Sequence, residues 1–173
     1  KYKMTLRENV ALGDIAGMED DGRVERCLLR AGLDLTKAEY REKGIDTLIA
    51  PDFGGIDISG GEWQLVALAR SYFRDHSFVV LDEPTSSIDP IREAEIYEQF
   101  MSFAKDKTAL IITHRLGAAT LADRIVLMDS GRIQEMGTHR QLMSMDGLYA
   151  TMFRAQAKWY RRGDIEESNR RLH

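Results

Sequence analysis

Residues 78–89 read Phe-Val-Val-Leu-Asp-Glu-Pro-Thr-Ser-Ser-Ile-Asp, so that four apolar residues run directly into the paired acids Asp82 and Glu83. A buried strand of a parallel sheet has such a continuous apolar run, which places the acids at its carboxyl end. Because phosphoryl transfer needs Mg²⁺ and a positioned water, we expect Asp82 to hold Mg²⁺, directly or through water, and Glu83 to orient or deprotonate the attacking water. An acid pair at a strand end, without further context, is about as often a solvated surface pair as a functional one. The continuation into residues 84–89 favours a functional site.

The chain around this stretch alternates between short apolar runs and helical or loop segments. Two further runs follow, at 109–113 and 125–128. This alternation predicts an α/β fold with a mostly parallel sheet. Between the first two runs, Asp89 can cap a helix that has Pro90 at its first position. The buried stripe of that helix is expected to consist of Ile96, Phe100, Phe103 and Ala104.

After the third run the sequence predicts a hairpin and then helices. Asp129-Ser130-Gly131 predicts a tight turn into residues Arg132–Met136, which gives an antiparallel pair of strands. Helices are expected at about 139–145 and 147–160. The charged tail is expected to fray.

The N-terminal part is predicted to be helical. Apolar positions on one helical face predict a helix within residues 20–31, and a second short helix is expected from Leu35 to Lys43. The glycine-rich stretch 44–58 is typical of a loop, and the i, i+3, i+4 spacing over 65–73 predicts a strongly amphipathic helix. The expected division is a helical subdomain over residues 1–75, an α/β core over 76–158 and a polar tail over 159–173.

The start of this amphipathic helix carries the sequence Ser59-Gly60-Gly61-Glu62. Ser59 and Glu62 have the spacing of a capping box. Each glycine lowers helix propensity by ~1 kcal/mol relative to alanine, so two in a first turn indicate an added role. Close approach of a phosphate is one such role, because a helix N-terminus offers unpaired N–H groups and a favourable dipole. A cap and an anion site are compatible.

His114 follows the second apolar run, one strand after the acid pair. A histidine at a strand end could contact a γ-phosphate. A single histidine is more often an ordinary surface residue. The functional interpretation of His114 therefore depends on its place one strand after the acid pair.

Composition bounds the class of protein. The 173 residues are 43% hydrophobic with a net charge of −4, which suits a soluble globular domain without a global basic field for nucleic acid. The single cysteine, Cys27, excludes an intrachain disulfide and suits a reducing cytoplasm. Apolar runs of four to five residues are far shorter than the ~20 that cross a bilayer. The chain opens at Lys1 rather than Met, which favours an engineered or trimmed start.

Together these motifs resemble the nucleotide-binding domain of ABC transporters. Residues Ile58–Glu62 are similar to the family's signature, Leu-Ser-Gly-Gly-Gln, and Phe78–Glu83 to its Walker B strand. Residues 86–89 resemble the D-loop and 113–115 the switch-histidine segment. Four motifs in the family's order are highly specific, and the likeness spans about residues 1–158. Residues Thr5–Val10 resemble the segment after the Q-loop in exporter-type domains, which favours export.

The resemblance implies a partial RecA-like P-loop NTPase core with a mostly parallel sheet, together with an ABC-type helical subdomain. In this family two nucleotide-binding domains sandwich two ATP molecules head to tail and drive a transmembrane domain. The implied cofactors are therefore ATP and Mg²⁺. The implied partners are a second nucleotide-binding domain and the transmembrane domain of the transporter, without nucleic acid. The implied place is the cytoplasmic face of the bacterial inner membrane, with this chain itself soluble.

The resemblance also implies residue roles. Glu83 would be the catalytic carboxylate, Asp82 the Mg²⁺ residue and His114 the γ-phosphate switch. The residues that would grip ATP bound to the opposite domain are Ser59, Gly60, Gly61 and Glu62. The D-loop residues Ser86 and Asp89 would link the two sites across the interface.

The sequence departs from the family in one large respect. No stretch fits G-x-x-x-x-G-K-[ST], the loop whose N–H groups cradle phosphates, and the adenine-stacking aromatic and Q-loop glutamine lie upstream in the family. We therefore expect this chain alone to bind ATP very weakly and not to hydrolyse it. One sheet edge and some apolar core should also be exposed. Glu62 stands where glutamine is commoner.

Two other functions fit part of this pattern. One is a non-catalytic partner that supplies only its signature face, which the missing phosphate loop favours and the retained Glu83 and His114 disfavour. The other is a soluble ABC-class ATPase of DNA maintenance. Those proteins carry long coiled-coil insertions, and no such heptads occur here.

Overall fold

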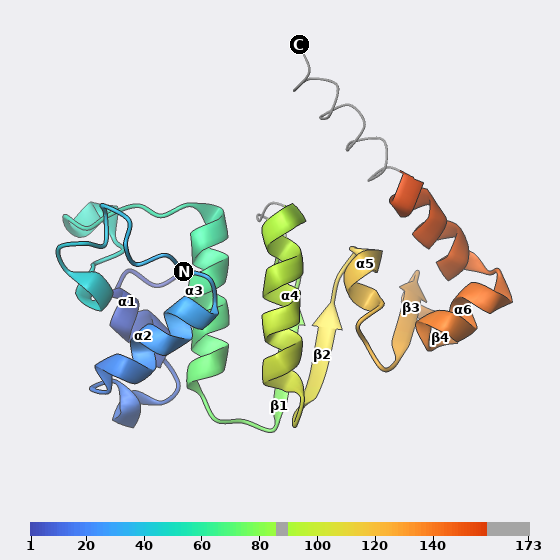
Figure 1. The fold of residues 1–173 in the computed structure, drawn as a ribbon, viewed down its shortest axis with the longest axis horizontal. Helices are drawn as coiled ribbons and strands as arrows, with labels where there is room; N and C mark the ends of the chain where they lie inside the picture. The colour runs from blue at the N-terminus through green and yellow to red at the C-terminus, as the bar shows by residue number, and fades with distance from the viewer. Residues whose placement is uncertain (86–89, 159–173) are drawn as a thin grey trace, which may run out of the picture. The chain divides into compact units, whose positions relative to one another are not determined.

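The computed structural model describes residues 1–85 and 90–158, and it divides into two compact units, Lys1–Ile112 and Thr113–His173 (Figure 1). Within the described ranges, no helix is both long and apolar enough to cross a membrane. The division at residue 75, between a helical part and an α/β part, stays a prediction.

The first unit begins with a helical layer. Its helices are α1 (Leu6–Ala11), α2 (Asp21–Arg30) and α3 (Gly60–Phe73), with short 3₁₀ turns at Ile15–Gly17, Gly44–Asp46 and Pro51–Phe53. The helices predicted within 20–31 and over 60–74 are confirmed. Leu6, Val10, Val24, Leu28 and Val66 are fully buried between α1, α2 and α3, so the amphipathic faces pack on one another.

The short helix expected from Leu35 to Lys43 is wrong, because these residues form turns. The Asp34 carboxylate accepts a hydrogen bond from the backbone N–H of Thr36 at 2.9 Å, which makes an Asx turn. The N–H of Tyr40 then reaches the carbonyl of Lys37, only three residues back. Side chains on these turns, rather than on a helix, approach the start of α3.

The α/β part of the first unit consists of β1 (Phe78–Asp82), α4 (Pro90–Ala104) and β2 (Thr108–Ile112). The two strands pair in parallel, from Phe78 opposite Thr108 to Asp82 opposite Ile112. A parallel pair needs a crossover connection, and α4 supplies it. The predicted parallel sheet is confirmed, and α4 begins at Pro90 as expected. Asp89, the expected cap, lies outside the described residues.

The two faces of this strand pair differ. Val79 is buried with Ile96, Phe100 and Ala104 of α4 in the core that also contains the N-terminal helices. The opposite face carries Phe78, Val80, Leu110 and Ile112, each about half exposed. Because side chains alternate along a strand, one face packs on α4 and the other presents an apolar surface.

The second unit contains α5 (Leu116–Ala119), β3 (Ile125–Asp129), β4 (Arg132–Gly137), α6 (His139–Met145) and helical residues 148–158. The predicted antiparallel hairpin is confirmed. Its two turn residues, Ser130 and Gly131, have φ angles of 50° and 73°, as a tight two-residue hairpin turn requires. A small core joins the hairpin to the helices through Ile125, Leu142 and Tyr149.

Candidate functional site

The first turn of α3 is held by a complete capping box. The Ser59 hydroxyl accepts a hydrogen bond from the backbone N–H of Glu62 at 3.2 Å, and the Glu62 carboxylate accepts one from the Ser59 N–H at 3.0 Å. Both Ser59 and Gly60 are exposed. The backbone N–H groups of Gly60 and Gly61 lie in the first turn, where the helix supplies no carbonyl partner. The turn therefore presents donors to solvent on a rigid support.

Two residues of the preceding turns anchor Glu62 from its other side. Lys37 Nζ lies 2.6 Å from Glu62 Oε1, and the Tyr40 hydroxyl donates to the same oxygen at 3.3 Å. Burial by itself raises the pKa of Glu62, but the hydrogen bonds from Lys37 and Ser59 lower it overall. Burial and the neighbouring Glu62 raise the pKa of Tyr40, so the phenol stays a donor. Sequence reasoning missed both anchors, since nothing in the pattern links residues 37 and 40 to a helix start at 59.

The paired acids stand at the end of β1, and both are exposed. Asp82 is the last paired residue of the strand, opposite Ile112. The next residue, Glu83, leaves the strand with a φ of 45°, a left-handed conformation that is strained for a residue other than glycine. Its N–H still donates to the Ile112 carbonyl at 2.9 Å. The turn therefore separates the directions of the two carboxylates while β2 holds their backbone.

The segment after the acids is tied to both neighbouring helices. Gln64 of α3 donates a long hydrogen bond of 3.5 Å to the Glu83 carbonyl. Thr85 is 1% exposed, and its hydroxyl bonds the Glu93 carboxylate at 3.0 Å and the Tyr97 hydroxyl at 3.3 Å on α4. Helix α3, which carries the Ser59 turn, and helix α4 thus both hold the residues that follow β1. The apolar pattern gave no signal for these polar contacts.

His114 comes two residues after Ile112 in the sequence and belongs to the second unit. Its carbonyl accepts a hydrogen bond from Gln156 Nε2 at 3.0 Å, and Gln156 Oε1 accepts one from the Leu116 N–H at 2.7 Å. One glutamine on the helical residues 148–158 therefore fixes the turn that bears His114. Ser86 and Asp89, the expected D-loop residues, lie outside the described residues.

Comparisons with known proteins agree on one family. A family model described as ABC transporter matches residues 1–86. The chain is 43% identical over 153 residues to the subtilin transport ATP-binding protein SpaT of Bacillus subtilis, which covers 88% of this chain and 25% of that protein. It is 41% identical over 155 residues to the ATP-dependent lipid A-core flippase of Paraburkholderia xenovorans, covering 90% and 25%. The chain belongs to the ABC transporter family.

A solved structure extends this assignment to the fold. The chain superposes on a bacterial Atm1-family ABC exporter with ATP bound, with a TM-score of 0.76 and 31% identity, over 90% of this chain and 26% of that one. The chain spans about a quarter of the length of the relatives it matches. Its fold is that of an ABC exporter nucleotide-binding domain over the part it covers, as the sequence predicted.

The capping box of Ser59 and Glu62 should carry a pH-dependent part of the chain's stability. The folded-state pKa of Glu62 lies below its ordinary value of 4.5, so its contribution is present above that value and is lost as the pH falls through the folded pKa. Glu62→Gln, which cannot titrate, should cost about 1 kcal/mol at pH 7. Urea unfolding at pH 7 and at pH 3 measures the difference, which should shrink in acid. Glu42→Gln, at an exposed position, is the control, and a difference that is equal at both pH values would contradict the prediction.

Proposed function

We propose that this chain is the C-terminal part of the nucleotide-binding domain of an ABC exporter, and that the whole protein hydrolyses ATP to drive export. The observation that carries the proposal is the pairing of two features in one unit. An exposed signature turn begins α3, and the acids Asp82 and Glu83 end β1, with Gln64 of α3 bonded to the Glu83 carbonyl. The transport functions of the subtilin transporter and the lipid A-core flippase favour this role over DNA maintenance.

In this proposal each residue acts on a nucleotide held between two domains. Asp82 holds Mg²⁺, Glu83 activates the attacking water and His114 contacts the γ-phosphate. Ser59, Gly60 and Gly61 donate to the phosphates of ATP bound to a second nucleotide-binding domain, and Glu62 holds their turn in place. Mg²⁺ neutralises charge on the phosphates when it is bound. Exposure of the Ser59 turn supports a role toward a partner, because a buried turn could not be reached.

The remaining proposals concern the assembly. Residues 1–75 form the signature-bearing helical subdomain and residues 76–158 the C-terminal part of the α/β core. The D-loop residues Ser86 and Asp89 connect the two ATP sites. A transmembrane domain couples ATP-driven closure of the sandwich to export, with the nucleotide-binding domains at the cytoplasmic face of the bacterial inner membrane. ATP hydrolysis by the whole protein in membranes, compared with the variants below, tests this function.

Ser59 offers a test that separates capping from phosphate contact. Aspartate caps a helix as well as serine does, so Ser59→Asp should keep α3 intact while placing a negative charge against the phosphates. We expect ATP hydrolysis by the whole protein to fall at least about tenfold, since a charge-assisted hydrogen bond is replaced by repulsion. Asparagine caps equally without the charge.

The matched control is therefore Ser59→Asn, which should retain much more of the activity than Ser59→Asp. Nucleotide binding to each variant is measured with a photoreactive ATP analogue. Binding should persist in both variants, because the proposal has ATP held by the phosphate loop of the opposite domain and Ser59 contacts it only from across the interface. Full hydrolysis by Ser59→Asp would remove Ser59 from the proposed site.

A further inference from the structure

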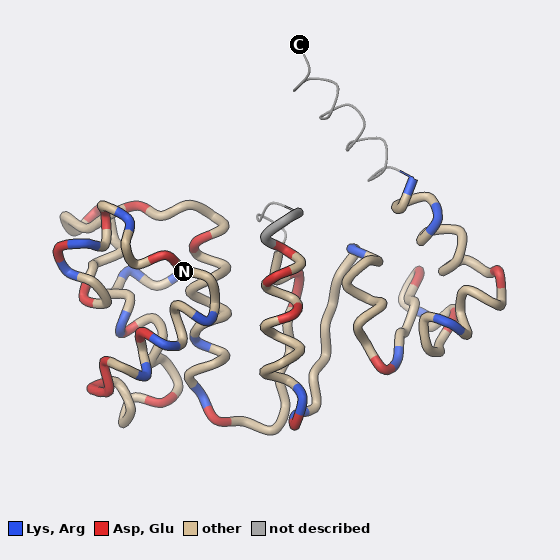
Figure 2. The backbone as a smooth tube through the Cα atoms, viewed as in Figure 1, with Lys and Arg blue, Asp and Glu red and all other residues tan. Residues whose placement is uncertain are grey.

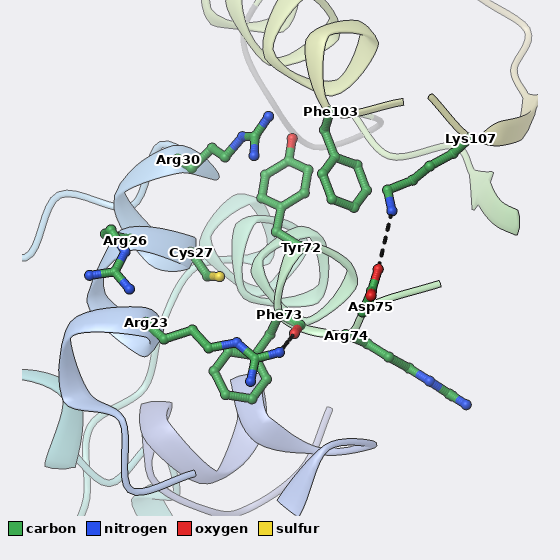
Figure 3. A pocket seen from close by; sticks show the side chains of 10 residues that line it. All are labelled: Arg23, Arg26, Cys27, Arg30, Tyr72, Phe73, Arg74, Asp75, Phe103 and Lys107. Atoms are coloured by element: carbon green, nitrogen blue, oxygen red, sulfur yellow. Dashed lines mark hydrogen bonds and ion pairs between the residues drawn. The ribbon is translucent and has the colours of Figure 1, made fainter. Parts of the chain in front are cut away.

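A cavity of about 350 Å³ opens between α2, the end of α3 and the end of α4, all within the first unit (Figure 3). Its floor is apolar and aromatic, with Cys27, Tyr72, Phe73 and Phe103. Its volume is at the lower end of the range for small-molecule sites. None of these residues belongs to the signature turn or to the acids at the end of β1.

The walls of this cavity are strongly cationic. Five basic side chains line it against the single carboxylate of Asp75, and they are Arg23, Arg26, Arg30, Arg74 and Lys107. Figure 2 shows the corresponding blue segments on α2, at the C-terminal end of α3 and after α4. The chain as a whole carries a net charge of −4, so this cluster is basic in a chain that is acidic overall.

Two of the five basic residues have anionic partners. Arg23 pairs with Asp14 at 2.8 Å and also donates to the Phe73 carbonyl. Lys107 lies 3.7 Å from Asp75. The other three, Arg26, Arg30 and Arg74, form no ion pair within the described part of the chain. Their charge is therefore open to a ligand.

The aromatic floor holds some of these cations in place. The Arg30 guanidinium lies 5.1 Å from the Tyr72 ring centre and 5.2 Å from that of Phe103. Lys107 lies 5.0 Å from the Phe103 ring centre. Stacking orients the Arg30 guanidinium but leaves its charge uncompensated, which favours an anion site at Arg30 over a satisfied surface.

Tyr72 adds an unused donor. Its side chain is 8% exposed, and its hydroxyl is buried without a hydrogen-bond partner among the described residues. In Figure 3 its ring stands between Arg30 and Phe103. Burial raises the pKa of Tyr72 to about 12, so the phenol keeps its proton at neutral pH. A buried donor without a partner is unfavourable, but its accessible surface of less than 1 Å² means that an acceptor on a ligand reaches it only if a neighbouring side chain moves.

Helix ends give a competing explanation for the cations. The C-terminal ends of α2, α3 and α4 meet here, at Arg30, Phe73 and Ala104. Each carries about half a negative elementary charge, which attracts basic side chains. Three such ends together with Asp75 and Asp14 compensate about 3.5 of the five positive charges, so a smaller positive excess remains.

We propose that this cavity binds a phosphate group carried on a small molecule with an apolar part, the phosphate on Arg30, which reaches toward Tyr72 in Figure 3, and the apolar part against Cys27, Tyr72 and Phe103. The site lies apart from the proposed ATP residues, and the inference does not depend on the proposed function. The phosphate could be that of a soluble ester or of a phospholipid headgroup, and the test separates the two.

Cys27 gives a direct readout, because it lines the cavity and is 9% exposed. In the whole protein, its alkylation by N-ethylmaleimide is followed by mass spectrometry of the peptide that contains it. Phenyl phosphate should protect Cys27 with half-protection below about 1 mM, and phenol, the uncharged analogue, should not. Arg30→Gln should weaken protection about tenfold. Arg41→Gln, an exposed arginine outside the cavity, should leave it unchanged.

Further arms identify the source of the phosphate. Vesicles of phosphatidic acid, compared with phosphatidylcholine, test a lipid headgroup, and inorganic phosphate tests the anion without an apolar part. Protection by phenyl phosphate or by phosphatidic acid that Arg30→Gln weakens supports the site and names its ligand class. Protection that phenol matches, that survives Arg30→Gln, or that is missing at about 10 mM phenyl phosphate and with both vesicles overturns it.

Discussion

Glu83→Gln in the whole protein is expected to leave ATP binding intact and to slow ATP hydrolysis at least about 10²-fold, because the amide keeps the shape of the side chain but cannot take a proton from water. Glu83 is exposed at the end of β1, and the bond from its N–H to the Ile112 carbonyl holds its backbone without involving the carboxylate. The substitution therefore removes a base without loosening the strand.

A second substitution at the same position separates catalysis from stability. The φ of 45° at Glu83 is strained for glutamate and easy for glycine, so Glu83→Gly should fold at least as stably as the parent and still fail to hydrolyse ATP. Glu98→Gln, at an exposed position of α4, is the matched control and should be fully active. Phosphate release assays with all three variants give the comparison. Substantial hydrolysis by Glu83→Gln would assign the water-activating role to another residue.

The strained backbone at Glu83 illustrates what the sequence could predict and what it could not. The run from Phe78 into Asp82 is continuously apolar, which favours a parallel strand, so its pairing and the acids at its end follow from pattern alone, although only Val79 of the run is buried in the structure. The capping box at Ser59 is equally local, since both partners lie within one helical turn. Such features depend on neighbours in the chain, and the sequence predicted them.

The contacts that hold the candidate site are long-range and polar. Lys37 and Tyr40 approach Glu62 only because residues 35–43 form turns, whereas their local pattern favoured a helix. Thr85 meets Glu93 through a buried hydrogen bond that no periodicity encodes. Tertiary contacts decided the conformation of these short segments over local propensity. The role of His114 rests on the family resemblance, because His114 belongs to the second unit and the paired acids belong to the first.

Alone, this 173-residue chain is expected to bind Mg-ATP more weakly than about 1 mM and to show no turnover. The sequence contains no G-x-x-x-x-G-K-[ST] loop, and such a loop contributes several backbone N–H groups and one lysine to the phosphates. Loss of only three such hydrogen bonds, at ~1.5 kcal/mol each, weakens binding by more than about 10³-fold. Isothermal titration calorimetry and a phosphate release assay measure the two quantities.

The exposed apolar face of β1 and β2 limits the protein concentration at which ATP binding can be titrated. Phe78, Val80, Leu110 and Ile112 present an apolar surface, so the isolated chain should self-associate as its concentration rises. Light scattering during size-exclusion chromatography identifies the range in which the chain is monomeric, and the titration belongs in that range. Leu110→Gln with Val80→Thr should reduce association while leaving Val79 and the buried face of β1 in place.

If the isolated chain binds ATP weakly, the residues that bind it must still be identified. The arginine-lined cavity accepts phosphate in our further inference, so the nucleotide could reach Arg30 rather than the acids at the end of β1. Millimolar binding that Arg30→Gln removes belongs to that cavity and leaves the prediction intact. Micromolar binding that survives Arg30→Gln but is lost in Asp82→Asn would contradict it, because the end of β1 would then hold a triphosphate without a phosphate loop. The two variants therefore assign any ATP bound by this chain to one place or the other.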